Sequence, residues 1–392
     1  MTAIGIMATI VATILVVPLA MLTAAFVIEV GAGLPPSRRR AGEPAPAPSA
    51  VVVMPAHDEA AIIGATLARL LPELPERFSV LVVADNCHDD TAALAQAAGA
   101  RSIRRDDPLH RGKGHALAFA RDHLAIDPPD VVLVLDADGA TDRASLAAMA
   151  ALALAGPVQA VNLLSPDLTA APMVQVSNFA FVIKNLVRQR GLFRLAGRAN
   201  LTGTGMAFPW PVFRDAALAT SDIVEDLSLG LDLARHGTLP RFAATATVWS
   251  ASSSAEGTLK QRQRWEGGFL ATSLRRALPA MAAAIRRGSP RDLWAGLSLA
   301  IPPLTLLILL DLIGLIVAAG LAALAGAPAW PAVVLGVLLL AAALVLVLAW
   351  RGVGRPFLSA GAAARLPFYL LWKIPLYLRL LTARQTAWLR AR

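Results

Sequence analysis

The stretch that decides the fold is Val131-Val132-Leu133-Val134-Leu135-Asp136-Ala137-Asp138, a short apolar run that ends in two carboxylates. Pro128-Pro129 precedes this run and Gly139 follows it. A short aliphatic run between such breaks is typical of a buried parallel strand. Open α/β sheets bind ligands beyond the carboxyl ends of their strands, so Asp136 and Asp138 are candidate ligands for a hard cation. The alternative is that a strand-end Asp caps the next helix.

Strand and helix patterns alternate on the amino-terminal side of this run. Strand patterns cover residues 51–54 and 79–84, and helical patterns cover residues 60–71, 91–98 and 114–124. Such alternation predicts parallel strands joined by right-handed crossovers. We therefore expect an α/β fold whose first half is a Rossmann-like nucleotide-binding sheet.

Polar loops follow two of the predicted strands. Pro55-Ala56-His57-Asp58-Glu59 follows the first strand, and Asp85-Asn86-Cys87-His88-Asp89-Asp90 follows the second. Because parallel strands point their carboxyl ends the same way, both loops should converge on the sheet edge that carries Asp136. The Asp85 carboxylate can accept a hydrogen bond from a base N–H, and Arg111-Gly112-Lys113-Gly114 offers cations and bare backbone to a phosphate.

Several side chains in these loops also have a purely structural interpretation. Asp58 and Asp90 each precede a predicted helix and can cap it. His57 and His88 can act as hydrogen-bonding groups within their loops instead of metal ligands. The residues alone leave both interpretations open.

Apolar segments long enough to cross a bilayer, about 20 residues each, flank the central region. The first runs from Ile4 to about Val30, and two more cover residues 304–325 and 332–350. No Lys or Arg precedes the first segment and Arg38-Arg39-Arg40 follow it, which predicts an uncleaved anchor with its amino end outside and the next region in the cytoplasm. A cleaved signal peptide is the alternative.

Four segments follow from this pattern. We expect a transmembrane anchor over residues 1–33, a Pro/Ala/Arg-rich linker over 34–49, a catalytic domain with interfacial helices over 50–292, and a transmembrane hairpin with a third membrane or interfacial helix over 293–392. We expect the whole chain to be a multi-pass protein of the inner (plasma) membrane.

Three features of these segments leave alternatives open. The amphipathic stretches 173–195 and 271–287 fit helices in the membrane interface, with a bundle-core position as the alternative. Asp311 lies within an apolar segment, where a structural or snorkelling role competes with a functional one. The last apolar stretch contains Lys373 and Pro375, so it fits either a third span or an interfacial helix.

Charge and cysteine content exclude several classes of protein. The net charge is +9, but the basic residues cluster beside apolar segments, where they contact anionic lipid and fix topology. We therefore expect membrane lipids, and no nucleic acid, as partners. The single cysteine, Cys87, excludes an internal disulfide and a cysteine-based zinc site, which agrees with a reducing cytoplasmic face.

A second acidic cluster and a short basic motif lie further along the chain. Glu225-Asp226 is followed by Gln261-x-x-Arg264-Trp265, and Gly203-Thr204-Gly205 precedes both. The acidic pair also fits the amino end of a helix, where the helix dipole stabilises carboxylates. The glycines of Gly203-Thr204-Gly205 permit close approach of a sugar, although a plain turn is the alternative.

The order of these motifs resembles that of membrane-embedded family-2 glycosyltransferases, the branch of cellulose, hyaluronan and other exopolysaccharide synthases and of ceramide glucosyltransferases. The resemblance covers about Val51 to Gly268, and the set of motifs is far more specific than any single member. It implies a GT-A catalytic domain, a UDP-sugar donor, Mg²⁺ or Mn²⁺, and inversion at the anomeric carbon.

The resemblance also implies roles for individual residues near the reacting bond. Asp226 would be the general base that takes the acceptor proton, with Glu225 beside it. Arg264 would neutralise the departing diphosphate, and Trp265 would form an aromatic wall at the acceptor site. Gln261 belongs to the same motif.

The remaining implied roles concern the donor, the metal and the acceptor. Residues on the nucleotide-sugar side would be Pro55, Ala56, His57, Glu59, Asp85, Lys113 and Asp136. The metal would be held by Asp138 with Asp136. The acceptor would meet Gly203, Thr204, Gly205 and Trp265.

Two departures from the family pattern bear on the function. Asp58 stands where Asn is common, and the carboxyl-terminal membrane region is shorter than in long processive synthases. The expected function is synthesis of an exopolysaccharide, a cell-envelope glycan or a glycolipid, on a lipid or a growing glycan as acceptor and with possible accessory export proteins. The alternative is a single-sugar transferase that acts on a lipid or polyprenyl phosphate. A nucleotidyltransferase and a non-catalytic membrane scaffold are the rivals from other classes.

Overall fold

The computed structural model describes residues 2–37, 48–220, 222, 224–251 and 255–382, with the backbone alone for 255–261 and 378–382. The chain forms two compact units. The membrane-helix unit comprises residues 1–35, 166–196 and 258–385, and the sheet unit comprises most of the remaining chain, 36–165 and 197–257. The range 50–292, which we expected to form one domain, is thus divided between the two units.

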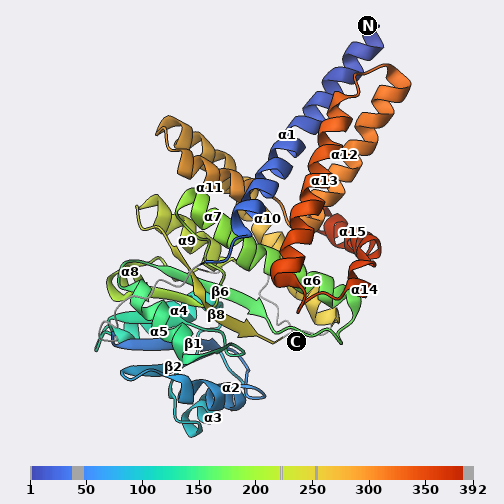
Figure 1. Cartoon of the computed structure of the whole chain (residues 1–392). Coiled ribbons are helices and arrows are strands. Elements are labelled where there is room, and N and C mark those ends of the chain that lie inside the picture. Colours follow the sequence, from blue (N-terminus) through green and yellow to red (C-terminus); the bar gives the residue numbers. More distant parts are fainter. Residues whose placement is uncertain (1, 38–47, 221, 223, 252–254, 383–392) are drawn as a thin grey trace. The chain divides into compact units, whose positions relative to one another are not determined.

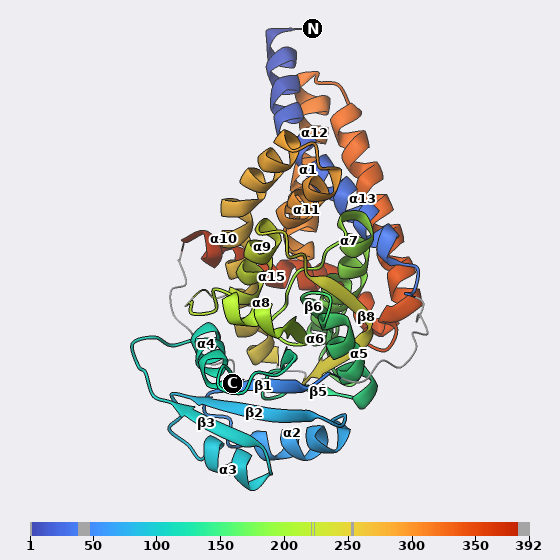
Figure 2. The same ribbon diagram turned by 90° about the vertical axis from the view of Figure 1, so that its left-hand side faces the viewer.

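The sheet unit contains an eight-stranded mixed sheet with the strand order β3-β2-β1-β4-β7-β6-β8-β5. Strands β1 to β4 are parallel, as predicted, and β7 runs antiparallel to β4 and β6. The strands are β1 (Ala50–Ala56), β2 (Phe78–Asp85), β3 (Arg101–Arg105), β4 (Val131–Val134), β5 (Ala140–Thr141), β6 (Val158–Leu164), β7 (Met206–Pro209) and β8 (Arg241–Ser250). Figure 2 shows β1, β2 and β3 side by side in one half of this sheet.

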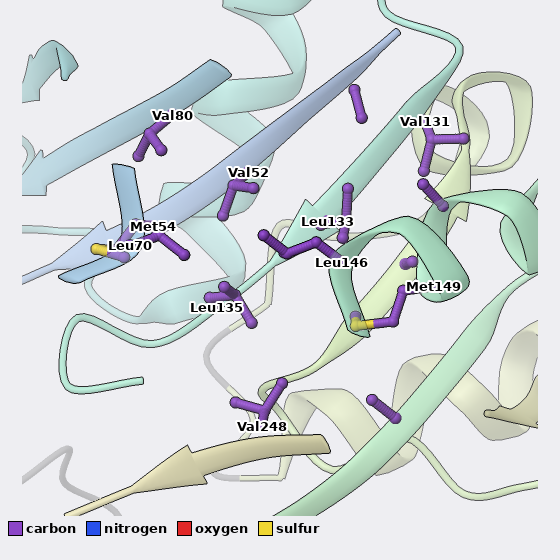
Figure 3. Packing of buried hydrophobic residues seen from close by; sticks show 14 of the residues in the cluster. Val52, Met54, Leu70, Val80, Val131, Leu133, Leu135, Leu146, Met149 and Val248 are labelled. Carbon is purple, nitrogen blue, oxygen red and sulfur yellow. The ribbon is translucent and has the colours of Figure 1, made fainter. Parts of the chain in front are cut away.

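Side chains that alternate along β1 and β4 build two hydrophobic cores, one on each face of the sheet. Val52 and Leu133 belong to one core, while Val53 and Val134 belong to the other. Figure 3 shows the first core, where Leu146 and other residues of the covering helix meet the strands. Successive side chains of a strand point to opposite faces of the sheet, and here both faces are buried. The strands are therefore continuous apolar runs in the sequence. The helices of this unit are α2 (Ile63–Leu70), α3 (Thr91–Ala97), α4 (Lys113–Leu124), α5 (Arg143–Ala153), α8 (Trp210–Asp215) and α9 (Glu225–Arg235).

The strand order places a topological switch point between β1 and β4. The chain adds β2 and β3 on one side of β1 and then returns to place β4 on the other side. The connections that leave the carboxyl ends of β1 and β4 therefore diverge, and ligands bind in the crevice that such divergence opens. Both predicted polar loops and the Asp136 turn follow strands at this edge.

Three helices of the membrane-helix unit, among the residues described, are long and apolar enough to cross a membrane: Ala3–Gly33, Leu304–Ala325 and Trp330–Gly354. The helices α1, α12 and α13 lie side by side in Figure 1 and Figure 2. This agrees with the predicted anchor and hairpin. The helical segments of this unit are α1 (Ala3–Gly33), α6 (Pro172–Val182), η2 (Ile183–Arg188), α7 (Gln189–Ala196), α10 (Ala255–Arg286), α11 (Pro290–Ala300), α12 (Leu304–Ala325), α13 (Trp330–Ala349), η3 (Trp350–Gly354), α14 (Ala360–Ala363) and α15 (Leu366–Thr382).

The Asp311 carboxylate is tied to the first helix of this unit. The Thr23 hydroxyl of α1 donates a 2.7 Å hydrogen bond to Asp311 Oδ2 of α12. Both side chains are buried. This pairing favours the structural role for Asp311, because a polar bond between two apolar helices fixes their register.

The segment 173–195 is a core helix of the membrane-helix unit. Segments α6, η2 and α7 are continuous there, and α7 packs closely against α1. A Cβ atom built on Gly191 would lie 1.9 Å from the carbonyl oxygen of Glu29, so only glycine permits this approach. Arg190 is buried and donates to the Gly33 carbonyl at 3.1 Å. These contacts support the bundle-core alternative for this segment, and the interfacial position remains a prediction.

Candidate active site

The predicted acidic turn leaves the sheet directly after β4. The Gly139 amide donates a 2.9 Å hydrogen bond to the Asp136 carbonyl, which closes a tight turn over residues 136–139. The Asp136 amide in turn donates to the Thr204 hydroxyl at 3.0 Å. Both Asp136 and Asp138 are partly exposed, whereas Thr204 is buried. Thr204 therefore holds the acidic turn through its hydroxyl, and the expected contact of Thr204 with the acceptor remains a prediction.

Lys113 places a cation at the centre of the candidate site. It begins α4, and its ammonium group donates to Asp136 Oδ1 and, at 2.6 Å, to the Gly203 carbonyl. Gly114 lets the start of α4 approach the loop between α8 and α9, since a Cβ at Gly114 would lie 2.4 Å from the Leu218 carbonyl oxygen. Burial by itself lowers the pKa of Lys113, but the surrounding carboxylates, above all that of Asp136, outweigh burial and raise it.

The second acidic pair lies against the same loop. Glu225 and Asp226 begin α9, as the helix-start interpretation predicted. Gly203 adopts a φ of +84°, and a Cβ at this position would lie 3.3 Å from Asp226 Oδ2. The structure thus brings together Lys113, Asp136, Gly203 and the acidic pair. A small pocket beside them is lined mainly by apolar groups, among them Leu117, Met206, Leu218 and Leu229.

The acidic pair cannot readily carry two full charges. Burial and the neighbouring carboxylate of Asp226 raise the pKa of Glu225 to about 8, although Lys113 opposes this shift. A raised pKa means that Glu225 retains its proton to a higher pH than an exposed glutamate does. Two adjacent carboxyl groups whose environments differ can divide the acid and base roles of a reaction between them.

This shift predicts how stability depends on pH. Because the folded pKa of Glu225, about 8, lies above the ordinary 4.5, the folded state retains a proton that the unfolded state releases in this interval. Metal-free protein should therefore lose up to about 1 kcal/mol of stability per pH unit as pH rises through it. In Glu225→Gln this part of the fall should vanish, as thermal denaturation in detergent at several pH values will show. The exposed Glu76→Gln is the control, and equal slopes for wild type and Glu225→Gln would contradict the assignment.

The predicted nucleobase contact, Asp85, is held by a buried ion pair. Arg105 donates to Asp85 Oδ1 at 2.6 Å, and both side chains are only 9% exposed. The side-chain amide of Asn86 donates to the same oxygen, Asp85 Oδ1, at 3.0 Å. Sequence reasoning missed Arg105, which stands directly opposite Asp85 in the β2–β3 register. The basic character of residues 101–105 was the only available signal, and it did not single out this arginine.

The loop after β1 is fixed by the loop after β2. The Glu59 amide donates to the Thr91 hydroxyl at 2.8 Å. Asp58 accepts from the His88 amide at 2.7 Å and does not cap α2, whose first residue is preceded by Ile62. Asp90 is the N-cap residue of α3, but its side chain makes no capping hydrogen bond. The helix-cap alternative is therefore wrong for Asp58, and for Asp90 it is right in position but not in side-chain bonding. Pro55 and Ala56 form the end of β1, where Ala56 is buried.

The residues of the Gln261-x-x-Arg264-Trp265 motif lie on α10. The side chain of Gln261 is outside the described set, and that of Arg264 is partly exposed. Trp265 stacks on Phe181, with 5.6 Å between ring centroids. Sequence reasoning missed Arg262, which is buried, donates to the Ser177 hydroxyl at 2.9 Å, and lies over both aromatic rings. Arg262 thus anchors the helix that carries the motif to α6.

The donor set at the acidic turn fits a hard divalent cation. Asp136 and Asp138 offer carboxylate oxygens, the ligands that Mg²⁺ and Mn²⁺ prefer. The Lys113 ammonium already binds Asp136 and shows that this carboxylate takes a cationic partner.

The parallel half-sheet, its switch point and the cation-carboxylate cluster define a GT-A domain of Rossmann-like type. Residues 46–268 match the family described as Glycosyltransferase like family 2, and this match covers more than half of the chain. The protein therefore belongs to glycosyltransferase family 2.

One solved structure supports the fold, and a second is similar over a shorter stretch. The mannosyltransferase PcManGT from Pyrobaculum calidifontis, solved in complex with GDP-Man and Mn²⁺, is similar over 95% of this chain and 99% of its own, with a TM-score of 0.56 and 19% identity. Glucosyl-3-phosphoglycerate synthase from Mycobacterium tuberculosis, solved with Mg²⁺ and UDP, covers 52% of this chain and 70% of its own, with a TM-score of 0.36 and 20% identity. No curated protein matches this chain. The first likeness, together with the family match, confirms the predicted GT-A fold.

Proposed function

We propose that this protein is an inverting membrane glycosyltransferase that moves a sugar from a UDP-sugar to a membrane-associated acceptor. The observation that carries the proposal is the cluster of Lys113, Asp136, Glu225 and Asp226 at the carboxyl edge of a nucleotide-binding type of sheet. Inversion needs one base within reach of the acceptor hydroxyl and no covalent intermediate. Asp226 supplies that base, because its carboxylate lies against the Gly203 loop beside Lys113, and the raised pKa of Glu225 agrees with this division of roles.

The donor is held by the loops that follow β1, β2 and β4. Asp85, oriented by Arg105, accepts a hydrogen bond from the uracil, and Glu59 lies in the nucleotide pocket. Asp136 and Asp138 hold Mg²⁺ or Mn²⁺, which supplies Lewis-acid stabilisation of the departing diphosphate. Arg264 adds a guanidinium to this leaving group, and Trp265 contributes to the acceptor side. Groups that meet developing charge stabilise the transition state more than the ground state.

The acceptor is proposed to be lipid-linked. Three candidate membrane spans, found among the residues that the structure describes, accompany the catalytic fold in one chain. A chain anchored in this way acts on substrates at the membrane surface, and nucleotide-activated sugars are cytoplasmic. We therefore propose the inner membrane as the location, with the sheet unit in the cytoplasm.

The number of candidate spans also favours one of two product classes. Three such helices in the described part of the chain make a smaller membrane region than the resemblance to long processive synthases implies. This favours transfer of a single sugar to a lipid or polyprenyl phosphate. Synthesis of an exported glycan on this scaffold would require accessory export proteins.

The test is nucleotide release from the purified full chain in lipid nanodiscs. A panel of UDP-sugars and GDP-mannose is supplied with Mg²⁺ or Mn²⁺, with and without a bacterial lipid extract. We expect release with one UDP-sugar, increased by the lipid extract, together with a labelled lipid product. Release that lipid does not increase would overturn the lipid acceptor, and release with GDP-mannose alone would overturn the UDP donor. Absence of release under every condition would contradict the proposed activity.

A further inference from the structure

A second group of metal-ligating side chains lies in the sheet unit, apart from the acidic turn. One ring nitrogen of His57, a carboxylate oxygen of Asp58 and Cys87 Sγ lie within 4.8 Å of one another. His57 and Asp58 follow β1, and Cys87 follows β2, two strands that pair in parallel up to Ala56 and Ala84. The strand register therefore brings three different ligand types together at one end of the sheet.

The hydrogen bond of His57 to a backbone carbonyl decides which of its ring nitrogens carries the proton. Its Nδ1 lies 2.7 Å from the backbone carbonyl of Asp85. A carbonyl oxygen only accepts hydrogen bonds, so Nδ1 carries the proton and Nε2 carries the lone pair. Nε2 lies 3.8 Å from Asp58 Oδ2. A histidine that donates its other N–H to a carbonyl is the usual arrangement of a metal-ligating imidazole.

The surroundings of Cys87 also fit a metal ligand. Its side chain is buried, and the Asp58 amide donates to its sulfur at 3.3 Å. The thiol in turn donates a hydrogen bond to the Ala56 carbonyl at 3.4 Å. Metal binding would release the thiol proton to solvent and form a metal–sulfur bond in its place.

The ligand types indicate which metal the group would take. A thiolate and an imidazole suit Zn²⁺, whereas Mg²⁺ and Mn²⁺ prefer oxygen ligands alone. One cysteine cannot build a cysteine-based zinc site, but it can contribute one ligand to a mixed one. A fourth position could be filled by water or by His88, whose Nδ1 lies 3.8 Å from Asp58 Oδ2.

We propose that His57, Asp58 and Cys87 form a binding site for Zn²⁺ or a similar transition metal, separate from the Mg²⁺ or Mn²⁺ site of the acidic turn. The bound ion ties the loop after β1 to the loop after β2. These loops carry Glu59 and Asp85, so the ion holds the nucleotide side of the sheet edge in place. This proposal does not depend on the donor or on the acceptor.

Cobalt binding to the full chain in nanodiscs tests the proposal. Co²⁺ replaces Zn²⁺ in such sites and reports thiolate ligation by a charge-transfer absorption band, which needs no turnover. After chelator treatment, we expect one Co²⁺ to bind with this band and Zn²⁺ to displace it. Asp58→Asn and His57→Gln should each weaken binding by about tenfold or more, and Cys87→Ser should abolish the band. Absence of the band in the wild-type protein would overturn the proposal.

Matched variants separate this site from a folding effect and from the catalytic metal. Asp58 has a φ of +53°, a conformation that asparagine also tolerates, so Asp58→Asn should fold normally and isolate the loss of a charged ligand. His236→Gln removes an exposed histidine and should leave cobalt binding unchanged. Asp138→Asn should keep the charge-transfer band while weakening Mn²⁺-dependent donor binding. A band that disappears in Asp138→Asn would contradict two separate sites.

Discussion

The Asp226→Asn variant is expected to lose sugar transfer by about 100-fold to 10,000-fold, the usual contribution of a general base. Asparagine has nearly the same shape but cannot take the proton of the acceptor hydroxyl. The Asp226 carboxylate lies beside the Gly203 loop, opposite the cation of Lys113, so its position follows from the fold of the sheet unit. UDP binding should persist, because the nucleotide contacts are assigned to other loops. Product formation and UDP affinity are to be measured on the same preparation.

Two further variants make this result decisive. Asp232→Asn changes a partly exposed carboxylate on the same helix, α9, and should leave the rate unchanged. Asp138→Asn should show the opposite pattern to Asp226→Asn, with metal-dependent donor binding weakened. Retained turnover in Asp226→Asn would exclude it as the base. Loss of UDP affinity in that variant would instead assign Asp226 to nucleotide binding or folding.

The Lys113→Met variant is expected to be less stable by about 2 kcal/mol and to have little activity. Methionine keeps much of the aliphatic stem but removes the cation that faces Asp136, Glu225 and Asp226. It also leaves the Gly203 carbonyl without its donor. The Asp136 side chain is 40% exposed, so solvent screens part of the lost attraction, and we expect a smaller loss than for a fully buried pair. Thermal or denaturant unfolding in detergent measures the change.

A double-mutant cycle isolates the interaction of Lys113 with Asp136. Asp136→Asn in the Lys113→Met background should cost less than Asp136→Asn alone, because the carboxylate has already lost its partner. Arg214→Met is the matched control: Arg214 pairs with Asp215 at 2.7 Å, but both side chains are more than half exposed. That variant should not change stability measurably. Additive losses at Lys113 and Asp136 would show that their contact contributes nothing.

The catalytic motifs were predictable because their chemistry and their strand context are both local. The run that ends in Asp136 could be recognised as a buried parallel strand, since residues on both faces of β4 are apolar. The parallel direction of β1, β2 and β4 then follows from the alternation of strands and helices. In contrast, β5 has two residues, too few to show a period in the sequence.

Other parts of the site required the folded chain. The sequence places Thr204 in the predicted acceptor loop, and the structure shows that it is buried and accepts a hydrogen bond from the Asp136 amide. Arg105 and Asp85 are 20 residues apart and meet only through the register of β2 and β3. The segment 173–195 shows charges at helical spacing, yet Arg190 finds backbone carbonyl partners at the end of α1 and is buried.

Local sequence patterns specify the kinds of element in this protein: apolar spans, a parallel half-sheet, and carboxylates placed at strand and helix ends. The length and the period of an apolar run are properties of neighbouring residues, so they can be recognised in the sequence alone. Which charges neutralise one another depends on the tertiary structure. It places Lys113 against Asp136, raises the pKa of Glu225 beside Asp226, and brings His57 close to Cys87. Burial and ion pairing depend on neighbours that are distant in sequence, and the packing of strands and helices selects those neighbours.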